Sequence, residues 1–378
     1  MTMTINNEHK KLNVPNLRFP EFQGEWEKCK LGDACNVFMC KRILASQTST
    51  EGCVPFYKIG TIGGTPDAYI SKELFDDYKA KYNYPHKGEV MITCAGTVGK
   101  CVIYDGKDAY YQDSNIVWID NPSQHISNGF LYHLLANVDW RKLNSTTIIR
   151  IYNDDLRNLK LSYPQIEEQK KISRLLFLLD ERIATQSKVI DKLQSLIKGI
   201  AQYCIKGLMR TEERVKLGNI CQITTGKLDA NAQIANGAYP FFTCAEQPFQ
   251  INNYSFDTEA LLISGNGANL GYINYYKGKF NAYQRTYVLD RFSTNIQYIK
   301  WALKVLLPRR IAIEKSSSNT PYIVLSTLTE LKLPIPSIER QKHIADLMQI
   351  LEKQMSEQIV MNDSYSRLKQ YLLRQMFI

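Results

Sequence analysis

One segment of this chain occurs twice. Residues 159–172 read LKLSYPQIEEQKKI, and residues 331–344, which lie 172 positions later, read LKLPIPSIERQKHI. Nine of the fourteen positions are identical. A sequence that repeats itself at about half its own length contains two copies of one structural unit. We therefore expect two similar modules and a function that uses both of them.

A shorter match marks where each module begins. The tripeptide Lys-Leu-Gly stands at residues 30–32 and again at residues 216–218. After each tripeptide, short runs rich in β-branched and aromatic residues alternate with turn residues, a pattern typical of strands. These features divide the chain into an N-terminal lead (1–27), a first domain (28–155), a helical segment (156–210), a second domain (211–327) and a final helical segment (328–378).

The two domains share a frame but differ in their polar loop residues. Aligned along the chain, Gly96 matches Gly267, Gln112 matches Gln284, and Ser145–Thr147 matches Ser317–Asn319. Most other polar residues between the strands are different in the two copies. We expect matching scaffolds that carry different recognition surfaces.

Each copy of the long segment leads into residues patterned as a long helix. Apolar residues recur about every 3.6 positions, as on one face of an α-helix, and Pro164 and Pro336 stand where the two helices begin. At 1.5 Å per residue each helix is roughly 60 Å long. The apolar stripe includes Ile172, Leu176, Leu179, Ile183 and Leu193 in the first helix and Ile344, Leu347, Leu351, Leu368 and Leu372 in the second.

The order of the chain predicts how the two helices pair. The first helix leads from one domain to the other, and a two-fold relation between the repeated units would bring the second helix back in the opposite direction. Gln186, Gln354 and Gln358 interrupt the apolar stripe, as polar residues do where the register of paired helices has to be set. We expect an α+β fold with two α/β domains separated by a pair of long antiparallel helices. The alternative is that each helix packs only on its own domain.

The charge balance favours a polyanionic partner. With 47 Lys and Arg against 37 Asp and Glu, the formal net charge is +10, and neutralisation of phosphates by such side chains releases condensed counterions. The longest aliphatic and aromatic run, residues 175–179, is far shorter than the roughly 20 residues of a transmembrane helix. The N-terminus lacks the apolar core of a signal peptide. We therefore expect a cytoplasmic protein with no membrane partner.

The cysteines do not predict a metal site or a set of disulfides. There are nine, an odd number, and they form no Cys-x-x-Cys pair. Zinc needs four ligands with short spacings, which Cys35 with Cys40, or Cys94 with Cys101, do not supply. We expect reduced, mostly buried thiols and no bound metal.

No catalytic motif is complete. In Gly96–Lys100, which reads GTVGK, the phosphate-loop pattern fails because it requires Gly at Cys94 and Ser or Thr at Cys101. A tight turn between two strands, with backbone amides available to a DNA phosphate, explains these glycines better. The chain also lacks the Asn/Asp-Pro-Pro-aromatic tetrapeptide of amino-methyltransferases and a G-x-G-x-x-G after a strand. Its scattered carboxylates neither form nor exclude a nuclease core.

Basic, amide and aromatic residues gather in the predicted loops of both domains. Arg suits O6 and N7 of guanine, Asn and Gln suit adenine, and Ser or Thr suits phosphates. Each residue taken alone is better explained as a solvated loop side chain or, for tyrosines, as part of the β core. Together they predict one DNA-facing cluster per domain. Its members are Lys41, Arg42, Lys58, Thr97, Lys100, Tyr111, Gln112, Ser114 and Asn115 in the first domain and Asn266, Asn269, Tyr283, Gln284, Arg285 and Tyr287 in the second.

Four features together resemble a known family. They are the lead LRFPEF…EW at Leu17–Trp26, the two Lys-Leu-Gly openings, the GTVG turn, and the P-x-I-E-x-Q-K-x-I segments at Pro164–Ile172 and Pro336–Ile344. Over nearly the whole chain they resemble the DNA-specificity subunits of type I restriction–modification enzymes. The second domain departs from the GTxG pattern, because Gly267–Gly271 is one residue longer.

The resemblance implies a division of roles. Each domain would be a target recognition domain that reads one half of a bipartite site in double-stranded DNA. The apolar stripes of the helices would form a spacer and a docking surface for two modification subunits, which carry S-adenosylmethionine and methylate adenine. Restriction subunits that use ATP and Mg would join them, and this chain itself would bind no cofactor and catalyse nothing. The alternatives are a self-sufficient DNA methyltransferase or nuclease with degenerate motifs, and an assembly scaffold whose domains bind protein.

Overall fold

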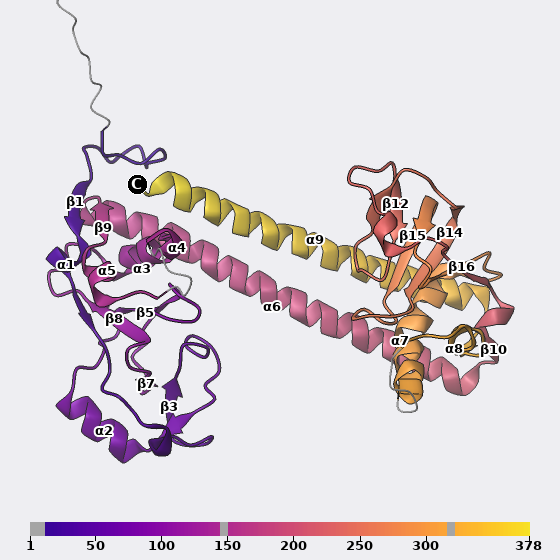
Figure 1. Ribbon diagram of the computed structural model, residues 1–378, viewed down its shortest axis with the longest axis horizontal. Coiled ribbons are helices and arrows are strands. Elements are labelled where there is room, and N and C mark those ends of the chain that lie inside the picture. Colours follow the sequence, from indigo (N-terminus) through magenta and orange to yellow (C-terminus); the bar gives the residue numbers. More distant parts are fainter. Residues whose placement is uncertain (1–11, 144–149, 316–321) are drawn as a thin grey trace, which may run out of the picture. The chain divides into compact units, whose positions relative to one another are not determined.

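The computed structural model describes residues 12–143, 150–315 and 322–378 of the chain. The contacts within it divide the chain into two units, which are drawn in Figure 1 with all their elements. The first unit is Met1–Thr185 together with Asn362–Ile378, and the second is Gln186–Met361. Each unit is described by itself below.

The first unit contains three small sheets. Strands β1 (Glu27–Lys30) and β9 (Lys160–Tyr163) form an antiparallel pair. A four-stranded antiparallel sheet has the order β2 (Asn36–Phe38), β8 (Ile116–Asp120), β5 (Val90–Thr93) and β6 (Cys101–Ile103). A three-stranded sheet has the order β4 (Tyr69–Ile70), β3 (Val54–Tyr57) and β7 (Tyr110–Tyr111). The shorter helices are α1 (Leu31–Ala34), α2 (Lys72–Lys81), α3 (Asn128–Asn137), α4 (Trp140–Leu143) and α5 (Asn153–Arg157), with a 3₁₀ turn at Ala45–Gln47.

The second unit is built around one larger sheet. Its strand order is β11 (Gln222–Thr225), β16 (Thr286–Asp290), β14 (Phe256–Ser264), β15 (Ile273–Ala282), β12 (Tyr239–Phe242) and β13 (Phe249–Ile251). Strands β10 (Arg214–Lys216) and β17 (Lys332–Pro334) form a separate antiparallel pair. The helices are α7 (Ile296–Lys315) and α8 (Leu325–Thr329), with 3₁₀ turns at Leu217–Asn219 and Ala230–Ala232.

The predicted internal repeat is confirmed in the strand connections. The pair β1–β9 corresponds to β10–β17, and the order β2-β8-β5-β6 corresponds to β11-β16-β14-β15. In both units one strand also runs parallel to its neighbour: β3 beside β7 in the first, and β12 beside β15 in the second. The ten-residue strand β15 therefore occupies the places of both β6 and β7.

The Lys-Leu-Gly tripeptides are packing motifs. Leu31 and Leu217 are both completely buried. A Cβ added at Gly32 would lie 3.1 Å from the Cβ of Arg157, and one added at the second glycine would lie 3.1 Å from the Cβ of Thr329. A larger residue would crowd the short helix beside it, so glycine suits the close approach of the two segments.

The glutamine of the duplicated segment attaches each long helix to its domain. Gln169 is buried, accepts a hydrogen bond from the Ser127 backbone N–H at 2.7 Å, and donates to the Pro164 carbonyl at 2.8 Å. Gln341 is buried in the same way, accepts from the Asn295 backbone N–H at 3.1 Å, and donates to the matching proline carbonyl at 2.8 Å. These contacts satisfy backbone groups where helices α3 and α7 begin, and they explain why the motif is kept in both copies.

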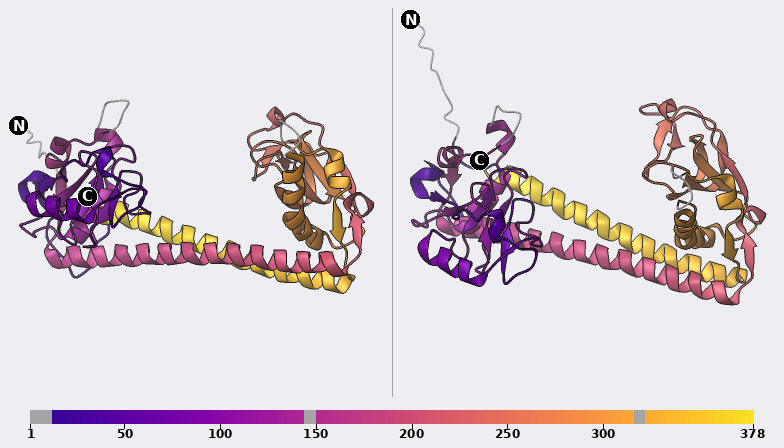
Figure 2. Two further views of the ribbon diagram at one scale, coloured as in Figure 1. Left: turned by 90° about the horizontal axis from the view of Figure 1, so that it is seen from below. Right: turned by 60° about the horizontal axis from the view of Figure 1, so that its bottom comes forward.

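The two long helices are α6 (Ile166–Thr211) and α9 (Ile338–Met376). In the first unit the beginning of α6 packs with the end of α9, through Leu176 and Leu372 among others. In the second unit the end of α6 packs with the beginning of α9, through Ile205 and Ile344 among others, and Figure 2 shows these segments side by side. The helices are therefore antiparallel, as predicted, and the alternative of separate packing is wrong.

Polar contacts accompany the apolar seam. Gln186 donates its Nε2 to the Oε1 of Gln358 at 2.6 Å, which agrees with the expected polar pairing. Asp180 of α6 forms an ion pair with Lys369. At the equivalent place of the second copy, 172 residues later, Glu352 of α9 pairs with Lys300 at 2.6 Å. The acids of the two copies thus occupy equivalent positions, although Asp180 pairs with a lysine of α9 and Glu352 with a lysine of α7.

Three details differ from the sequence expectation. Helix α2 was not foreseen, and α6 ends at Thr211, one residue beyond the helical segment expected at 156–210. Helix α7 contains Pro308 in its interior, where a helix is not expected from sequence. Across the parts of the chain that the structure describes, no helix has the length and apolar character needed to span a membrane.

Candidate nucleic-acid interface

Three loops of the first unit converge at one edge of its sheets. They follow β3 (residues 58–64), join β5 to β6 (residues 94–100), and join β7 to β8 (residues 112–115). The first two loops are in contact. A Cβ built at Gly96 would lie only 2.7 Å from the Cδ1 of Ile59, and Lys100 donates its Nζ to the Ile62 carbonyl at 2.5 Å. The third joins them through Gln112, whose Oε1 accepts from the Ile59 N–H at 3.4 Å.

The GTVG segment is a tight turn, as predicted. It lies between β5 and β6, and both Gly96 (φ +64°) and Gly99 (φ +82°) occupy the left-handed region that favours glycine. A Cβ at Gly99 would lie only 2.2 Å from the Cδ1 of Trp140, so the absence of a side chain at this position leaves room for the indole ring. The loop is therefore held against the domain, which keeps Thr97 exposed at its tip.

A cavity of about 460 Å³ opens beside these loops. It brings together five of the predicted DNA-facing residues, from segments up to 73 positions apart. Its charged lining contains three cations and one carboxylate, so the excess charge is positive. The polar and charged residues of this lining are Arg42, Thr48, Lys58, Gln112, Asp113, Ser114, Asn115 and Arg150.

A connected set of contacts holds the β7–β8 loop in this cavity. Arg42 donates its Nε to Oδ2 of Asp113 at 2.8 Å, and Ser114 donates its Oγ to the same oxygen at 3.3 Å. Ser114 has φ +61°, an unusual value for a residue with a side chain. Arg150 donates its Nη2 to the Ser114 carbonyl at 3.0 Å. The contacts with Arg42 and Arg150 come from outside the loop and stabilise its strained backbone.

The remaining predicted residues of the first unit lie around the cavity or apart from it. Lys58 is paired with Asp67 at 3.0 Å, and Lys41 lies over the ring of Tyr82, with 5.3 Å from Nζ to the ring centroid. Tyr111 is buried and its ring stacks on Tyr57, with centroids 5.9 Å apart. Burial removes Tyr111 from the DNA-facing set, because its side chain fills the core of the three-stranded sheet.

The second unit assembles its candidate loops around Cys244. This residue follows β12, donates its Sγ to Oδ1 of Asn266 at 3.0 Å, and accepts at its carbonyl a hydrogen bond from Nδ2 of Asn269 at 3.1 Å. Its Sγ also lies 3.6 Å from the carbonyl oxygen of Arg285, in the β15–β16 turn. Gln284 and Arg285 are exposed there. The same three loops as in the first unit thus meet again, with different side chains.

The sequence did not indicate Cys244 or Arg150 as members of the site, and it placed both Tyr283 and Tyr287 in the DNA-facing cluster. Tyr287 donates its hydroxyl to the Ile323 carbonyl at 2.8 Å and packs against the core, so it too has a structural role. Tyr283 is half-buried, with its backbone N–H bonded to the Phe242 carbonyl at 2.9 Å. The aligned serine-rich segments Ser145–Thr147 and Ser317–Asn319 lie outside the described residues.

The apolar stripe of the long helices is mainly internal packing. Six of its predicted members are buried in the unit cores and so offer no free surface for docking: Ile172, Leu176, Leu179, Ile344, Leu351 and Leu372. Ile183 and Leu193 are half-buried, whereas Leu347 and Leu368 are exposed. Any docking surface on these helices must therefore use the exposed residues rather than the stripe as a whole.

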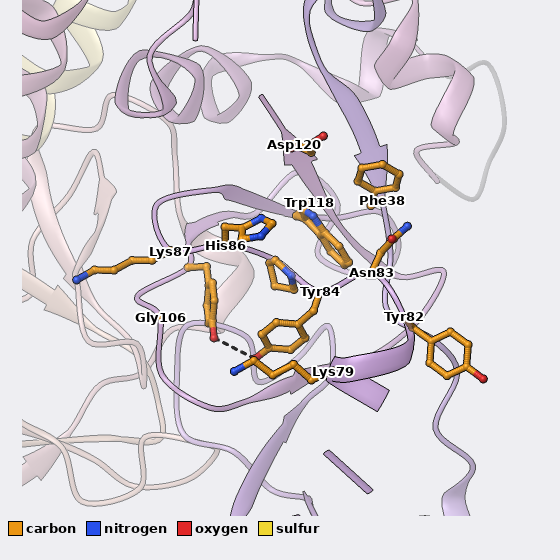
Figure 3. Close-up of a pocket in the computed structure, with 12 residues that line it drawn as sticks. Phe38, Lys79, Tyr82, Asn83, Tyr84, His86, Lys87, Gly106, Trp118 and Asp120 are labelled. Carbon is orange, nitrogen blue, oxygen red and sulfur yellow. Dashed lines mark hydrogen bonds between the residues drawn. The ribbon is translucent and has the colours of Figure 1, made fainter. Parts of the chain in front are cut away.

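A second hollow of about 550 Å³ lies in the first unit and was not predicted (Figure 3). Phe38, Trp118 and Tyr84 gather around it, and the Tyr84 hydroxyl lies 3.0 Å from that of Tyr104. Of the two lysines in its lining, Lys79 contacts Asp108 at 3.2 Å, and Asp120 adds a carboxylate to the lining. The hollow is therefore an aromatic recess with charges of both signs at its edge.

The cysteines are free thiols, and burial suppresses the reactivity of several of them. Burial raises the pKa of Cys35, Cys40 and Cys94 to about 12, so these thiols stay protonated near neutral pH. All nine cysteines are unpaired. Within the described ranges, no group of three or more His, Cys, Asp or Glu side chains is arranged to hold a metal ion.

Comparisons with known proteins agree with this architecture. Residues 23–195 and 209–360 match the family described as the type I restriction modification DNA specificity domain. A putative type I restriction enzyme specificity subunit of Haemophilus influenzae is 52% identical over 185 residues, which cover 49% of this chain and 44% of that protein. The EcoDI specificity subunit of Escherichia coli is 42% identical over 141 residues, 37% of this chain and 31% of that protein. The matched parts thus span less than half the length of either relative.

Solved structures share the fold. The S subunit of a type I restriction–modification system from M. genitalium superposes with a TM-score of 0.69 at 18% identity, covering 97% of this chain and 99% of that one. A chain from a structure on complex assembly and conformational transition of the type I system gives 0.54 at 16% identity, covering 93% and 97%. The family match over both halves, together with the repeated frame, identifies the protein: the chain belongs to the type I restriction–modification DNA specificity family.

Proposed function

We propose that this chain selects the DNA sequence on which a type I restriction–modification complex acts. Each unit would read one half of a bipartite site, using the three loops that meet at the edge of its sheet. One observation carries this proposal: the two units repeat one frame, yet they present different side chains at equivalent loops, such as Asp113 in one and Arg285 in the other. A repeated frame with unlike loops suits the reading of two unlike sequences.

The long helices suit the role of a spacer. Helix α6 has 46 residues and α9 has 39, so α6 is about 69 Å long at 1.5 Å per residue. Half-sites read from one face of B-DNA lie about 34 Å apart for each turn. A helix pair of this length is stiff enough to set such a separation.

We further propose that the exposed residues of α6 and α9 bind two modification subunits, and that restriction subunits join the same complex. Leu347, Ile350 and Val360 of α9, and Leu196 and Tyr203 of α6, are large apolar residues left exposed in the second unit. S-adenosylmethionine, ATP and Mg would be bound by those partners, and this chain would be non-catalytic. The incomplete phosphate-loop and methyltransferase patterns in the sequence support that division.

The deciding experiment is methylome sequencing of a host that carries this chain with its modification partners. We expect adenine methylation at one bipartite motif, which disappears when the chain alone is deleted. Methylation that persists without the chain would contradict the proposal. Methyl transfer by the purified chain with S-adenosylmethionine, in the absence of partners, would instead show a self-sufficient methyltransferase.

A further inference from the structure

Asp113 forms an ion pair with Arg42 beside the cavity of the first unit. The contact is made through Nε of Arg42, at 2.8 Å from Oδ2 of Asp113. An arginine side chain has five N–H donors, and those on the two terminal nitrogens form a fork at the end of the group. A carboxylate bound at Nε fixes the plane of the guanidinium and leaves this terminal fork available.

The Arg42 side chain faces solvent, whereas the Asp113 side chain that holds it is largely buried. The Arg42 side chain is 66% exposed, whereas that of Asp113 is only 15% exposed. Asp113 is itself held by the Ser114 hydroxyl at 3.3 Å, on a backbone that takes a positive φ at Ser114. In the described part of the chain, Arg42 makes no other ion pair. The geometry is that of a donor aimed outward by a second side chain.

Guanine is the base that matches this donor. In the major groove only guanine presents two acceptors side by side, O6 and N7, and arginine binds them with two parallel hydrogen bonds. A phosphate could also accept from the fork, but Asp113 places a negative charge next to it and so opposes a phosphate there.

We propose that Arg42 reads a guanine in the half-site of the first unit, and that Asp113 is its positioning residue. This inference rests on the proposed function. It applies to one half-site only, because the equivalent turn of the second unit carries Arg285, which has no ion-pair partner among the residues described there. The two half-sites are therefore expected to respond differently to the same kind of substitution.

The test uses the full chain in complex with its modification subunits, after the methylation motif is known. Duplexes carrying the motif are made with 7-deazaguanine at one guanine of the half-site at a time, which removes N7 and keeps the base pair. For the wild-type complex, one such position should weaken binding roughly tenfold or more, as expected when part of a bidentate contact is lost. For Arg42→Ala, the modified and the unmodified duplex should bind equally weakly, because the contact with N7 is already lost.

Two further variants separate base reading from charge. Arg42→Lys keeps the charge but not the planar fork, so 7-deazaguanine should weaken its binding less than it weakens that of the wild-type complex. Asp113→Asn keeps a similar shape but loses the charged partner, and it should reduce discrimination at this one position while the other half-site stays unchanged. The matched control is Arg157→Ala, which breaks an exposed pair with Asp154 (3.8 Å) outside the cavity and should leave every position as it was.

Clear outcomes would overturn the inference. If no guanine of either half-site shows coupling to Arg42, or if the coupled guanine belongs to the half-site assigned to the second unit, it is wrong. If Arg42→Ala weakens all duplexes equally and lowers the salt dependence of binding by about one ion, Arg42 binds a phosphate instead. The absence of any motif for the wild-type complex would refute the proposed function itself, which is a different result.

Discussion

At the scale of single residues, the duplicated motif is explained by buried hydrogen bonds rather than by contact with a ligand. Gln169 and Gln341 each serve backbone groups at the start of a neighbouring helix. Their identity could be read from the sequence because the motif is contiguous. Their role could not, because their partners, such as Ser127, lie about 40 residues away in the chain.

Replacing Gln169 by Leu should therefore destabilise the first unit. The substitution keeps the approximate volume but leaves the Ser127 N–H and the Pro164 carbonyl without their partner, at a cost of at least about 2 kcal/mol. Urea unfolding of the purified chain would measure this loss. Gln165→Leu, one turn earlier and exposed, is the control and should change little. Equal stability of the two variants would contradict the assigned role.

His133 makes a second prediction at this scale. It is buried between Tyr132 and Phe177, and burial lowers its pKa from 6.5 to about 4, with the nearby charge of Lys369 acting in the same direction and Asp180 opposing it. Between pH 4 and 6.5 the unfolded chain therefore binds more protons at this histidine than the folded chain does. The contribution of His133 to the free energy of unfolding is fully present above pH 6.5. It is lost as the pH falls toward 4, and the loss amounts to about 3 kcal/mol.

The measurement is the free energy of unfolding as a function of pH. His133→Phe keeps an aromatic ring and removes the titration, so the dependence between pH 6.5 and 4 should become shallower. His86→Gln serves as the control, because it removes an imidazole that is 84% exposed and leaves the core intact. An unchanged pH dependence in His133→Phe would show that other groups are responsible.

At the scale of elements, the long helices were the most predictable part of the chain. Their periodicity is local, so α6 and α9 could be placed from spacing alone, and the Gln186–Gln358 contact agrees with the expected polar seam. Helix α2 was missed although Ser71 caps its first turn and Lys79 and Lys81 stand in its last. Its ten residues lie between strand-like runs, and a single short helix there gives a weak pattern.

The spacer role predicts the effect of lengthening both helices. Seven residues, about two turns, inserted after Thr185 in α6 and after Met361 in α9 keep the packing faces aligned and add about 10 Å. The unread spacer of the methylated motif should grow by about three base pairs, at 3.4 Å each. Methylome sequencing would detect it. Insertion in α6 alone should disrupt pairing and methylation, whereas an unchanged spacer after the double insertion would exclude the spacer role.

At the scale of the whole molecule, the repeat itself is the main functional clue. Two units share strand order, helix attachment and an acid–lysine pair, but not their loop side chains. The domain limits read from the sequence, 28–155 and 211–327, stay a prediction that exchange experiments can test.

Exchanging residues 28–155 for the first domain of a related specificity subunit should change one half-site only. The other half-site and the spacer should persist, because the second unit and the helices are untouched. Methylome sequencing of the host carrying the hybrid chain gives the result directly. A change in both half-sites would mean that the domains do not read DNA independently, and an exchange of residues 211–327 provides the reciprocal control.

The sequence by itself determined the number of modules, their order and the antiparallel helices, because contiguous motifs and helical periodicity carry that information. Only the tertiary structure decided which loop residues share a site. Arg42 and Asp113 are 71 positions apart, and Ser114 and Arg150 are 36 apart. Arg42 and Asp113 meet because β2 pairs antiparallel with β8, which brings the segment after β2 beside the loop before β8. Tyr111 precedes the same loop in the sequence, yet the pairing of β7 with β3 places it in a strand, and its ring is buried in the core.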